Sequence, residues 1–341
     1  MPTNKKVTIT DVAKKANVSV ATVSRILNNR DGKIKISQKT TDRVLTVANE
    51  LGYQLNPFAA SLRTKRTGVI GAIVRDISDP FLVKVVKAVQ HYAHHNGVEL
   101  FLANTDYKSE TAHQQLKLMV NHWFDGLIIL DNLSEEDAFI QRLKHQQTPF
   151  VSITGESSCS LKPVVHTDDV NGVQQAIDHF IQLGHEHIGY IGNALPGVQM
   201  RYDYFCKYMK KRNLQVNSLY VQPEVTGRED IAEFMEGILA CKQPPTAIFC
   251  ATDALALKLV NVAGQYNVSI PNELSIIGFD NIDEAADYYP ALTTVSQSSD
   301  QLASQAVDLL MEIINTEQPI KKEIVIPPEL VVRESTSVPK G

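Results

Sequence analysis

From residue 67 onward the chain alternates short, continuous apolar runs with helical stretches, and it does so in two successive series. The apolar runs of the first series lie at 68–74, 98–103, 126–130 and 149–153, and those of the second at 187–192, 246–250 and 274–279. Strands that are apolar without alternation are buried on both faces, as in parallel sheets covered by helices. The pattern therefore predicts two doubly wound α/β lobes.

Helical stretches are expected between these strands, at 81–95, 109–122, 171–183, 227–241, 254–266 and 299–315. Sheets of this kind bind ligands beyond the carboxyl ends of their strands. Two such sheets in one chain predict a ligand cleft between the lobes.

The first 66 residues differ from the rest of the chain in charge. They hold 13 Lys and Arg against 4 Asp and Glu, a net charge of +9, whereas the remaining residues hold 20 against 34, a net charge of −14. A basic head on an acidic body indicates that the head binds a polyanion and that the body does not.

The head is predicted to form three short helices. Thr10 is the expected N-cap of the first helix, and Ser19 is that of the second, which runs to Asn28. Ser37 is the expected N-cap of the third, which ends at Gly52. Two short helices joined by a tight turn form the helix-turn-helix pattern, whose second helix can enter the DNA major groove. The third helix completes the small core with an apolar face formed by Val44, Leu45, Val47, Ala48 and Leu51.

The composition argues against several other classes of protein. No apolar run approaches the length of a bilayer span, and residues 1–10 lack the apolar core of a secretory signal. The four cysteines are scattered, which suits a reducing cytoplasm and argues against a disulfide frame. His91, His94 and His95 lie close together on a predicted helix, but neither a carboxylate nor a cysteine completes a metal site. With no phosphate-binding loop and no hydrolase motif, we expect neither a cofactor nor enzymatic activity.

Six segments of the chain resemble the lactose/galactose repressor (LacI/GalR) family. They are "VTITDVAKKANVSVATVSRILN", "ELGYQLNPFAASLR", "QLGHEHIGYIG", "PTAIFCATDALA", "LSIIGFDN" and "ALTTVSQ", and they keep the order and spacing of the family over nearly the whole chain. The resemblance implies a cytoplasmic homodimer that represses carbohydrate-utilisation genes by binding a pseudo-palindromic, double-stranded DNA operator. It also implies release of that DNA by a sugar or sugar derivative bound in the core.

The resemblance implies a division of the chain into domains as well. A helix-turn-helix head covers 1–55, and a hinge helix with its linker covers 56–66. The two lobes of the effector core resemble periplasmic binding proteins. The N-terminal lobe comprises 67–167 and 299–325, and the C-terminal lobe comprises 168–298 and 326–336, followed by a tail at 337–341.

By this resemblance, the second helix of the head is the recognition helix. Arg25 is expected to read a guanine, because a guanidinium can bond both acceptors of that base. The set of residues expected in the major groove is Ser19, Val20, Ala21, Thr22, Ser24, Arg25 and Asn28. The hydroxyl groups in this set are expected to hold phosphates, which position the helix without specifying sequence. The loop from Asn29 to Ile36 is longer than the family's usual connection, and it either adds phosphate contacts or is simply solvated.

The hinge resembles the family's minor-groove element. Asn56 is expected to cap a very short helix, in which Leu62 and its counterpart in a second copy insert into a central base step. Arg63 follows and would reach the groove floor or the DNA backbone. A plain linker is the alternative interpretation of this segment.

The resemblance assigns the effector site to the cleft, with contacts from Phe81, Asp168, Arg201, Phe249, Thr252, Asp280 and Gln297. Asp280 would accept hydrogen bonds from two sugar hydroxyls, and Arg201 matches the family's ligand-binding arginine, although Tyr204 replaces the usual glycine. Phe81 either stacks on the ligand or belongs to the core. Asp168 and Gln297 lie at the lobe crossovers, where they serve either as hinge residues or as ligand contacts.

Other residues near the cleft are weaker candidates. Asp79, Asn104 and Asp131 follow strands of the N-terminal lobe, and Asp253 is expected to cap a helix. Val225 stands where some sugar-binding relatives place an aromatic platform, so the sequence does not predict which sugar binds.

The sequence leaves open two alternatives to a repressor that is released by a sugar. In the same fold, a corepressor ligand or a phosphoprotein partner would tighten DNA binding instead of releasing it. A solute-binding module would have the core without specific DNA binding. The polar segment after Val332 contains no leucine heptad, which favours a dimer over a tetramer.

Overall fold

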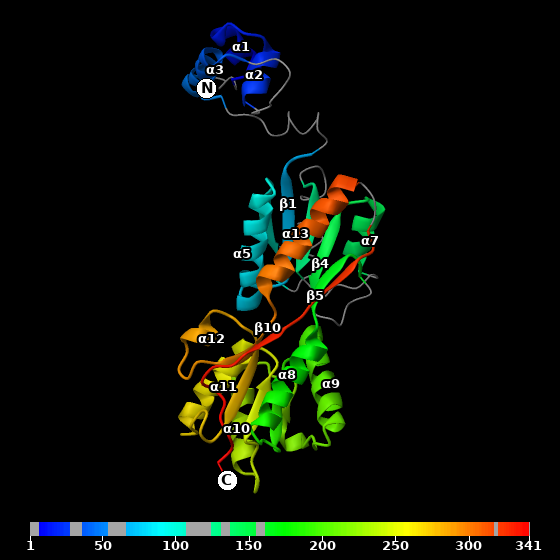
Figure 1. Ribbon diagram of the computed structural model, residues 1–341, viewed down its shortest axis with the longest axis vertical. Coiled ribbons are helices and arrows are strands. Elements are labelled where there is room, and N and C mark those ends of the chain that lie inside the picture. The colour runs from blue at the N-terminus through cyan, green and yellow to red at the C-terminus, as the bar shows by residue number, and fades with distance from the viewer. Residues whose placement is uncertain are drawn as a thin grey trace. The chain divides into compact units, whose positions relative to one another are not determined.

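The structure, a computed structural model, describes residues 7–27, 36–53, 66–106, 124–130, 137–154, 161–316 and 320–340. The chain divides into two compact units, 1–67 and 68–341 (Figure 1). Several predicted features lie outside the described residues, namely Asn28, the loop at 29–35, the hinge residues Asn56, Leu62 and Arg63, the helical stretch at 109–122, and Asp131.

The head contains the three predicted helices, α1 (Ile9–Ala16), α2 (Val20–Leu27) and α3 (Gln38–Glu50). Their buried side chains form one small core, made up of Val12, Ala13, Ala16, Val23, Val44, Val47 and Ala48. Leu45 was expected in this core but has 47% of its surface exposed. The reason is that Leu45 lies one position after Val44, which turns its side chain by about 100° around the helix axis.

The N-caps of α2 and α3 are the residues predicted from the sequence, whereas the N-cap of α1 is a different residue. Ser19 Oγ accepts a hydrogen bond from the Thr22 amide at 3.1 Å, and Ser37 caps α3 as predicted. The first helix is capped by Thr8 rather than Thr10. The Thr8 amide donates to Asp11 Oδ2 at 2.9 Å, which completes a capping box that Thr10 lacks.

We expect Thr8→Ala to destabilise α1 by about 1 kcal/mol, the usual value of an N-cap hydroxyl. Hydrogen exchange of the α1 amides in the full chain measures this effect as a rate increase of roughly 5-fold. Thr10→Ala is the matched control, because Thr10 lies inside the helix, where alanine is favourable. A larger effect of Thr10→Ala than of Thr8→Ala would contradict this assignment of the cap.

The N-terminal lobe contains a parallel six-stranded sheet with the order β11-β5-β4-β3-β1-β2. Its strands are β1 (Val69–Val74), β2 (Glu99–Asn104), β3 (Gly126–Leu130), β4 (Phe150–Thr154), β5 (Val164–Thr167) and β11 (Glu323–Ile326). Alternate residues of one strand face opposite helical layers. Ile70 of β1 packs against α5 (Pro80–His95) and α13 (Ser299–Thr316), whereas Ile73 packs against α7 (Ala138–His145).

The C-terminal lobe contains a second six-stranded sheet, with the order β12-β10-β9-β8-β6-β7 and only β12 antiparallel. Its strands are β6 (Ile188–Ile191), β7 (Val221–Gln222), β8 (Ala247–Cys250), β9 (Ser275–Asp280), β10 (Thr293–Ser296) and β12 (Glu329–Val331). On one face lie α8 (Asp169–Gln182) and α9 (Pro196–Lys211), and on the other α10 (Arg228–Leu239), α11 (Asp253–Gln265) and the short α12 (Glu284–Asp287). A 3₁₀ turn, Ser218–Tyr220, precedes β7. The prediction of two doubly wound lobes is confirmed.

The chain passes between the two sheets after Thr167, after Ser296 and after Ile326. Hydrogen bonds join these crossovers, because Thr167 Oγ1 donates to Gln297 Oε1 at 3.0 Å and the Asp168 amide donates to the Ile326 carbonyl at 3.0 Å. Beyond residue 336, where the predicted lobe ends, the Ser337 amide still donates to Ser275 Oγ at 3.0 Å.

Three helices, α7, α9 and the short α12, and five short strands were not predicted from the sequence. The missed strands, β5, β7, β10, β11 and β12, are two to four residues long, and each contains polar residues, so no continuous apolar run marks them. Within the ranges that the structure describes, we find no helix with both the length and the apolar character needed to cross a membrane.

Candidate functional site

A cavity of about 230 Å³ lies between the two lobes of the core. Five of the seven predicted effector residues line it: Phe81, Arg201, Thr252, Asp280 and Gln297. Phe81 belongs to α5 of the N-terminal lobe, whereas Arg201 and Asp280 belong to α9 and β9 of the C-terminal lobe. The cavity thus joins residues from both lobes at the carboxyl ends of their strands, where doubly wound folds bind ligands.

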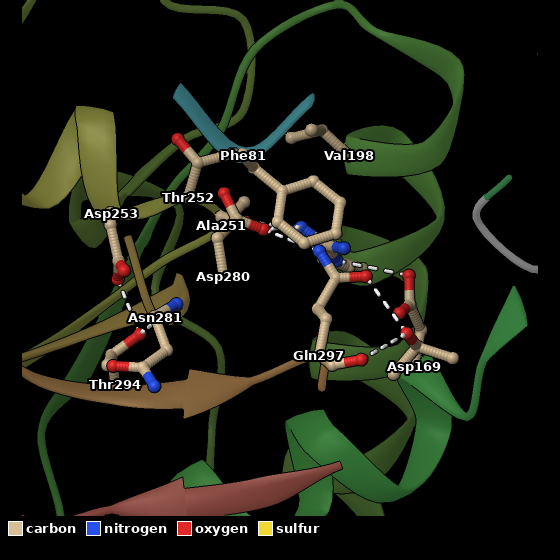
Figure 2. Close-up of polar contacts among 12 residues, drawn as sticks. Phe81, Asp169, Val198, Ala251, Thr252, Asp253, Asp280, Asn281, Thr294 and Gln297 are labelled. Atoms are coloured by element: carbon tan, nitrogen blue, oxygen red, sulfur yellow. Dashed lines mark hydrogen bonds and ion pairs between the residues drawn. The ribbon is translucent and has the colours of Figure 1, made fainter. Parts of the chain in front are cut away.

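Arg201 is the centre of the polar contacts in this cavity. Its Nε donates to Asp169 Oδ2 at 3.1 Å, and its Nη1 donates to the Ala251 carbonyl at 2.7 Å and lies 3.6 Å from Asp280 Oδ1 (Figure 2). The guanidinium carbon lies 3.7 Å from the ring centroid of Phe279, a cation–π arrangement. Buried charges need such partners, because an unpaired guanidinium away from water is costly.

Asp280 connects Arg201 to the crossover between the lobes. Gln297 Nε2 donates to Asp280 Oδ1 at 2.6 Å, and Gln297 Oε1 accepts the Thr167 hydroxyl (Figure 2). Gln297 was predicted to be either a hinge residue or a ligand contact, and its position fits both, because it lines the cavity and bonds to another crossover. A polar ligand here would touch groups that are already held in place.

Burial and neighbouring charges shift the pKa values of the ionisable groups in this network in opposite directions. Burial raises the pKa of Asp169, and the Arg201 guanidinium acts in the opposite direction. Burial also raises the pKa of Asp280 well above its ordinary value, again against the effect of Arg201. Burial alone would lower the pKa of Arg201, but the two carboxylates outweigh it and raise that pKa. The guanidinium therefore favours the ionised form of both carboxyl groups, whereas burial favours the neutral form.

The loop that carries Asp280 is held in a strained backbone conformation. Asp280 has φ 122° and Asn281 has φ 54°, values that side chains other than glycine rarely adopt. The buried carboxylate of Asp253 fixes this loop, because it accepts the Ile282 amide at 2.9 Å and the Thr294 hydroxyl at 2.5 Å (Figure 2). Burial raises the pKa of Asp253 to about 6.

The N-cap of α11 is not the residue that was predicted. Thr252, not Asp253, caps the helix, since Thr252 Oγ1 accepts the Leu255 amide at 3.2 Å. Gly278 of β9 leaves the room that Asp253 occupies, because a Cβ there would lie 2.1 Å from Asp253 Oδ1. Asp253 thus supports the loop that lines the cavity, a role that was not predicted from the sequence.

The two other predicted effector residues do not line the cavity. Asp168 caps α8, with its Oδ1 accepting the Asn171 amide at 2.9 Å. Phe249 is fully buried in the core beneath α8 and α9. Their neighbours in the structure, Asp169 and Phe279, make the contacts with Arg201, and the sequence analysis missed both.

The weaker candidates and Val225 have structural partners. Asp79 lines the cavity, but its Oδ1 accepts the Phe81 amide and its Oδ2 pairs with Arg75 at 3.0 Å. Asn104 accepts the Ile77 amide at 3.2 Å. Val225 is buried in the core of the C-terminal lobe.

The exposed face of α2 is the candidate nucleic-acid interface. Val23 turns into the head core, and as a result Ser19, Val20 and Ala21 face solvent at the start of the helix. Ser19 Oγ also bonds to Thr22 Oγ1 at 2.9 Å. Ser24 and Arg25 are half-buried further along the same helix. The arrangement presents small side chains and one arginine on a short helix, a size suited to the major groove.

Comparisons with known proteins match both units. Residues 8–56 match the model of bacterial regulatory proteins of the lacI family, and residues 177–336 match the periplasmic binding protein-like domain. The HTH-type transcriptional regulator DegA of Bacillus subtilis (strain 168) is 32% identical over 340 residues, covering 97% of this chain and 98% of DegA. The HTH-type transcriptional repressor PurR of Pasteurella multocida (strain Pm70) is 32% identical over 330 residues, covering 96% of this chain and 98% of PurR.

Solved structures agree with this result. The lac repressor dimer bound to operator and the anti-inducer ONPF superimposes with a TM-score of 0.84 at 24% identity, covering 98% of this chain and all of that one. A LacI family transcriptional regulator from Enterococcus faecium with bound ribose has a TM-score of 0.68 at 27% identity, covering 80% of this chain and all of that one.

Proposed function

The chain belongs to the lacI family of bacterial regulatory proteins, and from this premise we propose that a sugar or sugar derivative in its cavity releases it from a pseudo-palindromic operator. The chain is a DNA-binding transcriptional repressor with an effector-binding core, and repressors of this family dimerise on their operators. The proposal adds the class of the effector, the residues that hold it and the sign of its action. It includes no catalytic step.

The network of Arg201, Asp280 and Gln297 opposite Phe81 is the observation that carries the proposal. A sugar offers adjacent hydroxyls, each able to donate and accept, and the carboxylate of Asp280 accepts while Arg201 and Gln297 donate. The Phe81 ring offers an apolar surface to the ring face of a sugar. Related regulators with bound ribose and with D-xylulofuranose, at 27% and 26% identity, support the same class of ligand.

A ligand in this cavity would couple the two lobes. It would touch Phe81 in the N-terminal lobe and Asp280 in the C-terminal lobe, so its binding free energy differs between arrangements of the lobes. By linkage, an effector that favours the arrangement with weak DNA affinity lowers operator affinity, and operator lowers effector affinity by the same factor.

The test is a fluorescence anisotropy titration of the full chain, at fixed salt, against a pseudo-palindromic sequence selected from the DNA upstream of its own gene. Each titration is repeated with D-ribose, D-xylulose, D-glucose, cellobiose and a sugar phosphate. We expect specific binding, weakened by one of these sugars. A ligand that tightens binding would overturn the sign, and binding no better than to random DNA would favour a solute-binding module instead.

A further inference from the structure

We propose that Lys84 on α5 is a positioning residue for Asp280, because it holds the ligand-facing loop 280–283 from the opposite lobe. Its role toward a sugar rests on the proposed function, whereas its role in the loop does not. Lys84 itself is absent from the lining of the cavity among the described residues. It would act on the ligand only through the loop.

Lys84 makes two contacts across the lobes. Its Nζ donates to the Asn281 carbonyl at 2.8 Å and lies 2.9 Å from Asp283 Oδ1. The Lys84 side chain is 31% exposed, so the contact with the carbonyl is partly shielded from water. The pKa of Asp283 is lowered, mainly by its hydrogen bond with Lys84. An ammonium group shared by a carbonyl and a carboxylate fixes both ends of a three-residue segment.

The same loop is also held by its own lobe. Asp253 accepts the Ile282 amide, the Asn281 amide donates to Thr294 Oγ1 at 3.3 Å, and Arg333 Nη2 donates to Asn281 Oδ1 at 2.7 Å. These partners belong to the C-terminal lobe and move with the loop when the lobes rotate. Lys84 belongs to the other lobe. Of the contacts described here for this loop, only those of Lys84 therefore change when the lobes move relative to each other.

The position of the loop determines the position of the Asp280 carboxylate. Asp280 and Asn281 both have positive φ, a strained conformation that persists only when several contacts hold it. The Asn281 carbonyl, which Lys84 binds, is one residue from the carboxylate that Gln297 binds at 2.6 Å. Loss of the Lys84 contact would therefore loosen the acceptor that the ligand needs.

Hydrogen exchange of the full chain without added sugar tests this role directly. In Lys84→Met we expect the amides of 281–286 to exchange about 3- to 10-fold faster, the effect of losing one partly solvent-exposed hydrogen bond. The amides of α13, in the core of the N-terminal lobe, should keep their wild-type rates. Lys84→Arg should restore slow exchange, because a guanidinium can bridge the same two acceptors.

Lys87→Met is the matched control. Lys87 is exposed one turn further along α5 and acts on Asp283 only through its charge. The proposal would be overturned if the amides of 281–286 exchanged at the wild-type rate in Lys84→Met, or if Lys87→Met accelerated their exchange equally. It would also be overturned if Lys84→Met accelerated exchange throughout both sheets.

The operator titration separates this inference from the proposed function. With the same sugars, Lys84→Met should need about 3- to 10-fold more sugar for half release than the wild type and Lys87→Met. If no sugar releases the wild type, the proposed function fails, while the exchange rates still decide the role of Lys84. If a sugar releases Lys84→Met and wild type at equal concentration, Lys84 does not position Asp280 for the ligand.

Discussion

Arg201→Met is expected to lower the free energy of unfolding of the core by about 3–5 kcal/mol and to abolish release from the operator by sugar. Methionine keeps the length of the side chain but leaves the buried carboxylates of Asp169 and Asp280 without their cation. Asp169 Oδ1 already has no hydrogen-bond partner among the described residues, which leaves Arg201 as the main support of that charge. Urea unfolding of the full chain, followed by circular dichroism, measures the loss.

Arg212→Met, at the C-cap of the same helix, is the control. Arg212 pairs with Asp178 at 2.8 Å, but both side chains are substantially exposed, so its loss should cost at most about 1 kcal/mol. Adding Asp169→Asn to Arg201→Met should recover part of the stability, because it removes one unpaired charge. If Arg201→Met costs no more than Arg212→Met, the buried network does not stabilise the core as described.

Arg25→Ala is expected to weaken binding to the operator by about 10- to 100-fold while weakening binding to random DNA much less. The reason is that a guanidinium can bond both acceptors of a guanine, an interaction that random DNA offers only by chance. Arg25 lies on α2, whose exposed start presents Val20 and Ala21, side chains that offer no hydrogen bonds to a base. Anisotropy titrations with both DNAs at one salt concentration measure the ratio.

Arg25→Lys separates the two possible roles of this residue. Lysine keeps the positive charge but lacks the planar fork, so it should restore affinity for random DNA and leave operator binding weak. If alanine weakens binding to both DNAs equally and lysine restores both, Arg25 contacts phosphate rather than a base.

Much of the fold follows from local patterns in the sequence. The continuous apolar runs predicted seven strands of the two sheets, and each lies within about one residue of its expected bounds. Ser19 and Ser37 cap their helices as expected. Short strands such as β7, which has only two residues, were missed, because they form through pairing with neighbours that the local sequence does not reveal.

Two predicted site residues were wrong because a residue next to them, in the chain or on the adjacent strand, makes the contact with Arg201. Asp168 and Asp169 are adjacent, and only the second turns inward to Arg201, because the first caps α8 and must face its open end. Phe249 and Phe279 lie on adjacent strands and both are buried, yet only Phe279 lies under the guanidinium. Asp253 was taken for a helix cap, although its carboxylate supports the loop after β9.

The sequence by itself determined the class of the fold and the basic three-helix head, because periodicity, charge and capping depend on residues close together in the chain. Its resemblance to the lacI family, rather than any local pattern, indicated five of the residues that line the cavity. Only the tertiary structure decided which carboxylate pairs with Arg201, which residues support the Asp280 loop and that Lys84 reaches it from the other lobe. Those contacts join residues about 30 to 200 positions apart, and the direction of each side chain is set by how the helices and sheets pack.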